Sequence, residues 1–281
     1  MFDLSALRTF ILVSEHLNFT TVADLRNTVQ SAISAQIKRL EESTGKTLVL
    51  RGRGQNMQLT PEGKAFLVYA RRILALSQEA IDSMDSAGSF AKLRLGTTVT
   101  LAMSVVSDVL NAFVEQHADV QIEITCNRSD ALLGLLDSGE IDAAFMIDQG
   151  KRNGRVFVHS QPLVWVGADG LELPDQGPVP LAFMSDGRDL RHYALAALDE
   201  AGRSSRIAHL SRHPIGIRAF VQSGLAITVM PKVTVKPPLT ILPERSKLPP
   251  LAPVALAAYA RGERMAQDAS KLFELIESGI S

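Results

Sequence analysis

The segment from Val29 to Leu40 constrains the fold of this chain more than any other. Ile33, Ile37 and Leu40 recur at helical spacing on one side, while polar and basic side chains occupy the other sides. Such a helix can bury one face and present hydrogen-bonding groups and positive charge on another. Reading base edges in the major groove of DNA requires this combination. The segment therefore predicts a DNA recognition helix.

The residues before this segment predict two further helices. Asp3 or Ser5 can cap the first of them, and Thr20 or Thr21 can cap a short second one. A short turn then leads into the recognition helix, which is expected to end near Gly45 because glycine is a common C-terminal stop. A short helix, a tight turn and a helix with a polar outer face together predict a helix-turn-helix.

A wing is expected directly after the recognition helix. Residues 48–50 and 57–59 have the apolar character of two short strands, and the connection between them is rich in glycine and arginine. Arg53 lies in this connection. A basic hairpin of this kind would lie along the phosphate backbone of bound DNA.

A long helix is predicted from Pro61 to about residue 86, because Thr60-Pro61-Glu62 combines a capping hydroxyl, a proline at the first helical position and an acid in the first turn. Its apolar residues follow a heptad-like spacing. We expect this stripe to form a dimer contact, and the alternative is packing against its own domain. The stripe comprises Leu67, Ala70, Leu74, Ile81 and Met84.

From residue 91 onward, apolar runs alternate with helical segments, which predicts an α/β domain with mostly parallel sheets. A break near residue 161 divides it into two lobes with a ligand cleft between them. The expected strands are 93–96, 120–125, 141–147, 163–166, 181–184, 207–210 and 226–230, and the expected helices are 100–116, 130–138, 190–201 and 214–222.

The predicted domains are a winged helix-turn-helix over residues 1–60, a linking dimerisation helix over 61–90 and an effector-binding domain over 91–281. Within the last domain, the first lobe takes about 91–161 and 262–281, and the second takes about 162–261. Residues 231–253 are expected to form a surface connection. A last strand over 254–259 would return to the first lobe, followed by a closing helix over 263–279.

Composition narrows the classes of protein. With 281 residues, 46% of them hydrophobic and 21% charged, the chain is expected to fold and to work in the cytoplasm, because no export signal or membrane-length apolar run is present. Residues 1–60 hold seven basic and five acidic side chains, so the prediction of DNA binding depends on arrangement rather than on bulk charge. The single cysteine, Cys126, cannot form an internal disulfide and is expected to be buried near a strand end.

Several motifs, in this order and spacing, resemble the LysR-type transcriptional regulators of bacteria, and the resemblance covers essentially the whole chain. Two looser signatures occur in the second half, Gly139-Glu140-Ile141-Asp142-Ala143-Ala144 and residues 224–231. The motifs in the first half are Leu7-Arg8-Thr9-Phe10, Asn18-Phe19-Thr20, Gln30-Ser31-Ala32-Ile33-Ser34, Ile37-Lys38-Arg39-Leu40-Glu41, Leu59-Thr60-Pro61-Glu62-Gly63 and Tyr69-Ala70-Arg71-Arg72-Ile73-Leu74.

The resemblance implies a homodimer or homotetramer that binds a palindromic-type operator in double-stranded DNA. It also implies a periplasmic-binding-protein-like C-terminal domain whose small-molecule effector changes transcription. By resemblance, Gln30, Ser31, Ser34 and Ala35 match groove-facing positions, and Lys38 and Arg53 match phosphate contacts. Thr20 completes the set of expected DNA-binding residues.

Three positions depart from the family pattern. Ala35 stands where many relatives carry a long polar side chain, so one base contact, about 1–3 kcal/mol of discrimination, is expected to be missing. Val29 replaces the usual capping hydroxyl of the recognition helix, with Thr28 as an alternative cap. Arg26 occupies a usually apolar position, so its guanidinium is expected to reach solvent or a phosphate.

The expected effector site draws on both lobes. Thr97, Thr98 and Thr100 lie between the first strand of this domain and its helix, where hydroxyls and free N–H groups can hold an anion. By resemblance, Thr100 and Ser129 match the family's ligand-contacting hydroxyls, and helix capping is the alternative role. Arg191 is expected to face the cleft and to favour an anionic effector, with a surface salt bridge as the alternative. By resemblance, His213 falls in the connection where the family's second lobe approaches the ligand.

No metal, cofactor or enzyme active site is expected. His209 and His213 have a metal-like spacing, but they are predicted to span a strand end and a turn rather than one helix. Asp137, Glu140 and Asp142 are expected to be solvated. The favoured function is a ligand-responsive transcription regulator. The alternatives are a DNA-binding regulator whose C-terminal domain serves only assembly or a protein partner, and a solute-binding protein, which the absent export signal and the winged helix argue against.

Overall fold

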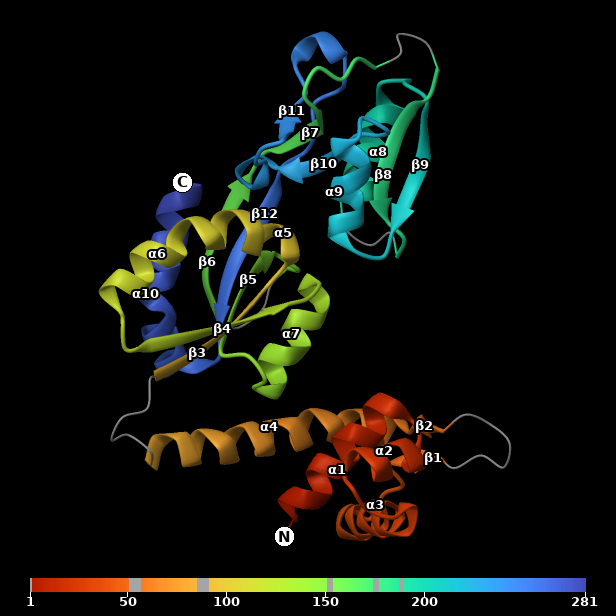
Figure 1. The fold of residues 1–281 in the computed structure, drawn as a ribbon, viewed down its shortest axis with the longest axis vertical. Coiled ribbons are helices and arrows are strands. Elements are labelled where there is room, and N and C mark those ends of the chain that lie inside the picture. The colour runs from red at the N-terminus through yellow and green to blue at the C-terminus, as the bar shows by residue number, and fades with distance from the viewer. Residues whose placement is uncertain (1, 51–56, 85–90, 151–153, 174–176, 187–189) are drawn as a thin grey trace.

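The computed structural model describes residues 2–50, 57–84, 91–150, 154–173, 177–186 and 190–281. A winged helix-turn-helix lies at one end of the molecule, and a long helix, α4, leads from it beneath a two-lobed α/β domain (Figure 1). The predicted order of a winged helix, a linking helix and a two-lobed domain is therefore the order that the structure has.

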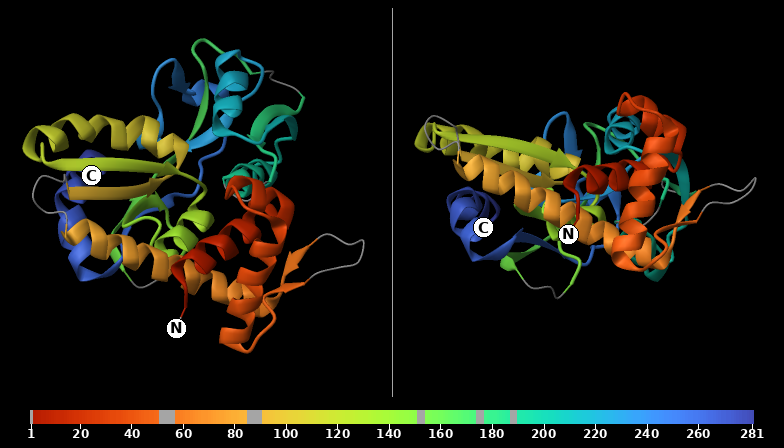
Figure 2. Two further views of the ribbon diagram at one scale, coloured as in Figure 1. Left: turned by 60° about the horizontal axis from the view of Figure 1, so that its bottom comes forward. Right: turned by 90° about the horizontal axis from the view of Figure 1, so that it is seen from below.

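The winged domain consists of helices α1 (Leu4–His16), α2 (Phe19–Leu25) and α3 (Gln30–Thr44) and an antiparallel pair of strands, β1 (Val49–Leu50) and β2 (Gln58–Leu59). The wing strands project away from the first lobe (Figure 2). The tip of the wing, including Arg53, lies outside the described residues.

The caps of these helices differ in part from the expectation. Asp3 caps α1 as predicted, and its carboxylate accepts a hydrogen bond from the Ser5 N–H. Asn18, rather than Thr20 or Thr21, caps α2, because its side-chain oxygen accepts from the N–H groups of both threonines. Val29 precedes α3, and within the described residues neither it nor Thr28 supplies a side-chain cap.

Polar contacts attach the wing to the recognition helix and to α4. Oε1 of Glu41 accepts hydrogen bonds from the N–H groups of Leu48 and Val49, at 2.8 and 3.2 Å. The Thr60 hydroxyl accepts from the Gly63 N–H at 2.8 Å and donates to the Thr47 carbonyl at 2.7 Å. The bonds to Glu41 hold the start of the wing against α3, and those of Thr60 hold the same segment against the start of α4. The sequence motifs did not indicate this role of Glu41.

Helix α4 spans Pro61–Met84. Three residues of the expected dimer stripe contact their own winged domain, because Ala70 is fully buried and Leu67 and Leu74 are half-buried against its core. Ile81 is exposed, and nothing is described for the Met84 side chain. Among the described side chains of α4, the large apolar ones that are exposed are Val68, Tyr69, Leu76 and Ile81.

The first lobe is built on a five-stranded sheet. Strand β3 (Ala91–Thr97) pairs in parallel with β4 (Val120–Cys126) and β5 (Ala143–Ile147), as predicted. Strand β12 (Val254–Ala260), however, pairs antiparallel with β5 and with β6 (Arg155–Gln161). The sequence pattern did not predict β6. Residues 254–260 therefore belong to the first lobe, as expected for the last strand, so the lobe boundary lies before this strand rather than at residue 261. The strand order is β4 (Val120–Cys126), β3 (Ala91–Thr97), β5 (Ala143–Ile147), β12 (Val254–Ala260) and β6 (Arg155–Gln161).

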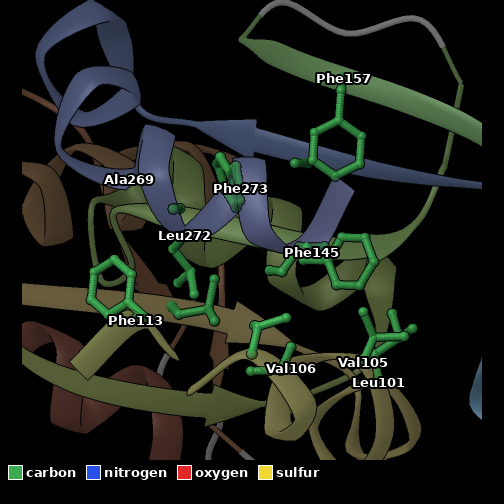
Figure 3. Close-up of a cluster of buried hydrophobic side chains, with 14 of the residues drawn as sticks. Leu101, Val105, Val106, Phe113, Phe145, Phe157, Ala269, Leu272 and Phe273 are labelled. Atoms are coloured by element: carbon green, nitrogen blue, oxygen red, sulfur yellow. The ribbon is translucent and has the colours of Figure 1, made fainter. Parts of the chain in front are cut away.

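Helices cover both faces of this sheet (Figure 1). On one side, the expected helix 100–116 is divided into α5 (Val99–Leu101), a π-helical turn and α6 (Ser107–Gln116), and α10 (Gly262–Ile280) packs beside it. Helix α7 (Ser129–Ser138) lies on the other side. The core between α6, α10 and the sheet is rich in phenylalanine (Figure 3) and includes Phe113, Phe145, Phe157, Leu272 and Phe273.

The second lobe is less parallel than predicted. Strands β10 (Thr228–Pro231) and β11 (Leu239–Ile241) both pair antiparallel with β7 (Leu163–Ala168), and β11 lies within the expected surface connection. Strands β8 (Val179–Met184) and β9 (Ser205–Ser211) form a separate parallel pair. Helices α8 (Arg191–Glu200) and α9 (Pro214–Gln222) accompany them.

Helix α4 contacts the first lobe at the end of α7. The Arg71 guanidinium lies 3.0 Å from the Glu15 carboxylate in α1 and 3.1 Å from the Glu140 carboxylate after α7. Gly139 has a φ of +76°, and a Cβ added there would lie 3.1 Å from the Ala75 Cβ. Gly139 and Glu140, from the first signature of the second half, therefore lie against α4.

Asp142 is buried, which corrects the expectation that it is solvated. Its side chain is 4% exposed and binds the Arg94 guanidinium through both carboxylate oxygens, at 3.0 and 2.7 Å. The Arg94 N–H also donates to it at 3.0 Å, and the Arg261 guanidinium lies at 3.5 Å. Asp142 needs these partners, because burial of an unpaired carboxylate at this position would cost free energy.

Candidate DNA interface and effector cleft

The recognition helix α3 presents its expected contact residues outward. Ile33, Ile37 and Leu40 are buried in the winged domain, so the opposite side of the helix faces solvent at the end of the molecule remote from the second lobe (Figure 1). Ser34 is half-exposed. The exposed members of the predicted set are Thr20, Gln30, Ser31, Ala35 and Lys38.

The Lys38 ammonium is available to a phosphate. Its side chain is 72% exposed, and its contact with Glu42, one helical turn away, is 3.7 Å long. Ion pairs of this exposed kind are weak and are screened by salt. A DNA phosphate can therefore replace Glu42 as the partner of Lys38 at small cost.

Arg26 does not reach outward as expected. Its guanidinium is half-buried and donates to the Ser5 carbonyl oxygen, to the Ser5 hydroxyl and to the Thr9 hydroxyl. Ser5 and Thr9 belong to α1, so Arg26 connects the turn of the helix-turn-helix with the first helix. The expectation of solvent or a phosphate overlooked α1 as a source of acceptors.

A cavity of about 1040 Å³ lies between the two lobes. Its wall includes the ends of β3, β4 and β5 from the first lobe, and the loops beside β8, α8 and α9 from the second. A cavity of this size, lined by apolar and polar side chains in similar number, can enclose a small organic molecule that carries polar groups. Apolar lining residues from the two lobes include Met103, Ile147, Phe183, Tyr193 and Ile217.

The structure brings four of the five predicted effector residues to this cavity. Thr98, Thr100 and Ser129 line it from the first lobe, and His213 lines it from the second. The Thr98 hydroxyl also accepts a hydrogen bond from the Leu101 N–H at 3.3 Å, so it has the capping role as well.

Arg191 is not among the lining residues. Its Nη2 donates to the Met184 carbonyl oxygen at 2.6 Å, and its guanidinium lies over the Phe183 ring, 5.9 Å from the ring centre. The structure thus replaces the expected cleft contact with a bond inside the second lobe. Among the residues that the structure describes, Arg212 and Arg218 are the arginines that this lobe presents to the cavity.

Ion pairs connect the lobes on two sides of the cleft. Arg128, immediately before α7, contacts Asp130 in its own lobe and Asp186 in the second lobe. Its hydrogen bond holds the pKa of Asp130 below the ordinary value for a carboxyl group. The second bridge joins Lys236 to Asp108 in α6. Sequence spacing could not reveal these pairs, because each partner follows a different strand or helix.

A third carboxylate at the cavity, Asp148, is neutralised within the first lobe. Its two oxygens each lie 2.9 Å from Nη2 of Arg155, and the Tyr259 hydroxyl donates to it. Burial raises the pKa of Tyr259, so its hydroxyl stays protonated and remains a donor. The cavity therefore contains charged groups that are largely paired.

The sequence motifs also singled out Cys126, His209 and His213, and the structure describes the surroundings of each. Cys126 is the last residue of β4 and is exposed at the cavity, which corrects the expectation of a buried thiol. Partial burial nevertheless raises the pKa of its thiol. The His209 ring lies in β9 and stacks on Phe220 at 4.5 Å, whereas His213 precedes α9.

A DNA-facing helix and a ligand-sized cleft in one chain define a class of ligand-responsive DNA-binding proteins. The family model described as "Bacterial regulatory helix-turn-helix protein, lysR family" matches residues 4–64, and the model described as "LysR substrate binding domain" matches residues 86–279. The chain belongs to the LysR family of transcriptional regulators. This is a family of regulators rather than of enzymes.

Relatives of similar length support this assignment. The HTH-type transcriptional regulator DgdR of Burkholderia cepacia is 34% identical over 257 residues, which cover 90% of this chain and 86% of the relative. The HTH-type transcriptional regulator PecT of Dickeya dadantii is 28% identical, and the match covers 99% and 87% of the two chains. The crystal structure of CbnR, a LysR family transcriptional regulator, shares the fold with a TM-score of 0.68 at 21% identity, over 99% of both chains.

In the part of the chain that the structure describes, no helix is both long enough and apolar enough to cross a bilayer.

Proposed function

We propose that this protein is a sequence-specific transcription regulator whose activity a small effector in the interlobe cavity changes. The observation that carries the proposal is the outward polar face of α3, which displays Gln30, Ser31 and Ser34 on a helix held by its apolar side. Base reading by such a helix needs polar side chains that are free of the core. Because the protein would act on chromosomal DNA, we infer a cytoplasmic location.

Gln30 and Ser34 are proposed to read bases, and Lys38 and Arg53 to contact phosphates. Gln30→Ala and Ser34→Ala should each lower discrimination between a preferred and a random duplex by about 1–3 kcal/mol, while affinity for random DNA stays nearly constant. Fluorescence anisotropy with both duplexes at one salt concentration measures the two quantities.

Gln121→Ala is the matched control, because Gln121 is an exposed glutamine in β4 of the effector domain. It should change neither affinity. Equal losses on both duplexes in Gln30→Ala would show that Gln30 contributes general affinity and would contradict its role in base reading.

The effector is proposed to bind through Thr98, Thr100, Ser129 and His213, with an anionic group favoured by the hydroxyls and by Arg212 and Arg218. A small carboxylate that binds should raise the melting temperature, and Thr100→Val should abolish this shift, because the variant keeps the shape of threonine but loses its hydroxyl. Differential scanning fluorimetry across a panel of small carboxylates measures the shifts.

Thr240→Val, in β11 and outside the cavity wall, is the control for this series and should keep the full shift. A shift that survives Thr100→Val would place the ligand elsewhere. If compounds of every class fail to shift the melting temperature while duplex preference is intact, the alternative function is favoured, in which the C-terminal domain serves assembly or a protein partner.

We also propose that α4 forms a contact between copies of the chain in a homodimer or homotetramer. Tyr69 and Leu76 lie seven residues apart, so they share one exposed face of the helix, with Val68 at its edge, and this face supports the assignment. Ile81 is exposed and lies seven residues after Leu74, so it continues the other stripe, in which Ala70 is buried and Leu67 and Leu74 are half-buried against the winged domain.

A further inference from the structure

A chain of hydrogen bonds runs from the helix-turn-helix turn through α1 to the recognition helix. Nη1 of Arg26 donates to Oγ1 of Thr9 at 2.8 Å and to the Ser5 carbonyl oxygen at 3.1 Å, and Nη2 donates to Oγ of Ser5 at 3.2 Å. The Thr9 hydroxyl in turn donates to Oε1 of Gln36 at 2.5 Å. Gln36 belongs to α3. The turn after α2 and two helices, α1 and α3, therefore meet in one polar network.

The centre of this network is closed to solvent. Thr9 is fully buried, and Arg26, Ser5 and Gln36 are half-buried. Hydrogen bonds from a charged donor in such a setting are stronger than neutral ones, and removal of one member leaves its partners unsatisfied. The Thr9 hydroxyl donates its one proton to Gln36 and accepts a hydrogen bond from Arg26. The position of Gln36 therefore depends on that of Arg26.

At its C-terminal end α3 is held by the bonds that Glu41 accepts from the Leu48 and Val49 N–H groups, so the half of the helix that carries Gln30 and Ser34 depends on other contacts for its rotation. Ile33, Ile37 and Leu40 hold the helix by apolar packing, which is non-directional. Val29, before the first turn, supplies no side-chain cap within the described residues. Gln36 is next in sequence to the exposed Ala35, so a directional bond at Gln36 limits rotation of α3 about its own axis.

We propose that Arg26 is a positioning residue for base recognition: it acts through Thr9 and Gln36 to hold the rotation at which Gln30 and Ser34 meet the bases. Arg26 itself faces α1. The inference rests on the proposed function of α3. It assigns to an arginine in the turn an effect on which duplex is preferred, rather than on how strongly any DNA is bound.

The test uses the full chain and a duplex that the wild-type protein selects from a random library. Arg26→Leu and Thr9→Val should each lower the ratio of affinities for the selected and a scrambled duplex by about tenfold, the size of one base contact. Thr9→Val changes no charge, so its affinity for scrambled DNA should stay unchanged. Arg26→Lys, which keeps a donor, and Thr9→Ser, which keeps the hydroxyl, should restore most of the ratio.

Because the two residues act in series, Arg26→Leu combined with Thr9→Val should lose no more preference than either change alone. Arg206→Leu, an exposed arginine in β9, controls for the loss of one positive charge. Melting temperatures are measured for every variant, and the threonine pair decides the test if Arg26→Leu does not fold.

A fall in melting temperature with an unchanged affinity ratio in Thr9→Val would overturn the positioning role and leave the proposed function intact. Additive losses in the double variant would overturn it as well. If the wild-type protein itself prefers no duplex over its scrambled form, base reading by α3 fails, and the role of Arg26 fails with it.

Discussion

Asp142→Ala should lower the free energy of unfolding of the effector domain by about 3 kcal/mol, because removal of one partner from a buried ion pair leaves the other charge uncompensated. Asp142 is almost fully buried and holds Arg94 by two side-chain bonds and one backbone bond. The value lies at the low end for buried pairs, since Arg94 keeps part of its exposure. Urea denaturation followed by circular dichroism measures the change.

Glu123→Ala is the control for this prediction. Glu123 pairs with Lys92 at 2.6 Å on the surface of the same sheet, and both side chains are about half-exposed. Its loss should cost at most about 1 kcal/mol. Equal effects of the two substitutions would show that Asp142 is effectively solvated and would contradict the paired, buried arrangement.

Gly63→Ala should disrupt the winged domain, with a loss of about 1–3 kcal/mol or more and a parallel loss of DNA binding. A Cβ at Gly63 would lie 2.1 Å from the Leu48 carbonyl oxygen, which is backbone and cannot rotate away. Relief of the clash would separate α4 from the strand that leads into the wing. Thermal unfolding together with anisotropy on a duplex measures both consequences.

Gly134→Ala is the matched control, because Gly134 lies in α7 with no described neighbour within 4 Å of an added Cβ. This change should stabilise the helix by about 0.5–1 kcal/mol, since alanine has the higher helix propensity. A tolerated Gly63→Ala would mean that α4 does not approach Leu48 as closely as the structure shows.

Local sequence patterns predicted the DNA-binding half well. The period of Ile33, Ile37 and Leu40 defines the buried face of α3, and the Thr60-Pro61-Glu62 start places the first turn of α4. These features depend on residues within a few positions of one another. Where a nearer or stronger competitor exists, the local rule fails, as it does for Asn18, which precedes Thr20 and takes the capping role.

Features that depend on distant partners were missed. Strand β6 has alternating exposure and its outer edge is unpaired in the described sheet, so its sequence lacks the continuous apolar run of a central strand. The pairing of Asp142 with Arg94 joins positions in two parallel strand regions, which no spacing rule connects. Arg191 was assigned to the cleft because its helix starts there, but the Met184 carbonyl lies nearer.

Interlobe contacts show the same limit. The bridges from Arg128 to Asp186 and from Lys236 to Asp108 depend on how the two lobes are placed, and neither pair lies within one motif. Thr98 and Thr100 were predicted because a strand-to-helix junction is recognisable in sequence, and Thr100 and Ser129 also match the ligand-contacting positions of the family. The site was therefore predictable on the side of the regular sheet and less so on the side of the second lobe.

The central claim is that the outer face of α3 reads DNA sequence. The most direct measurement is the affinity of the full chain for a duplex enriched from a random library and for its scrambled form, at about 150 mM salt. The account predicts that the enriched duplex binds at least about 1,000-fold more tightly. Equal affinity for the two duplexes would contradict it.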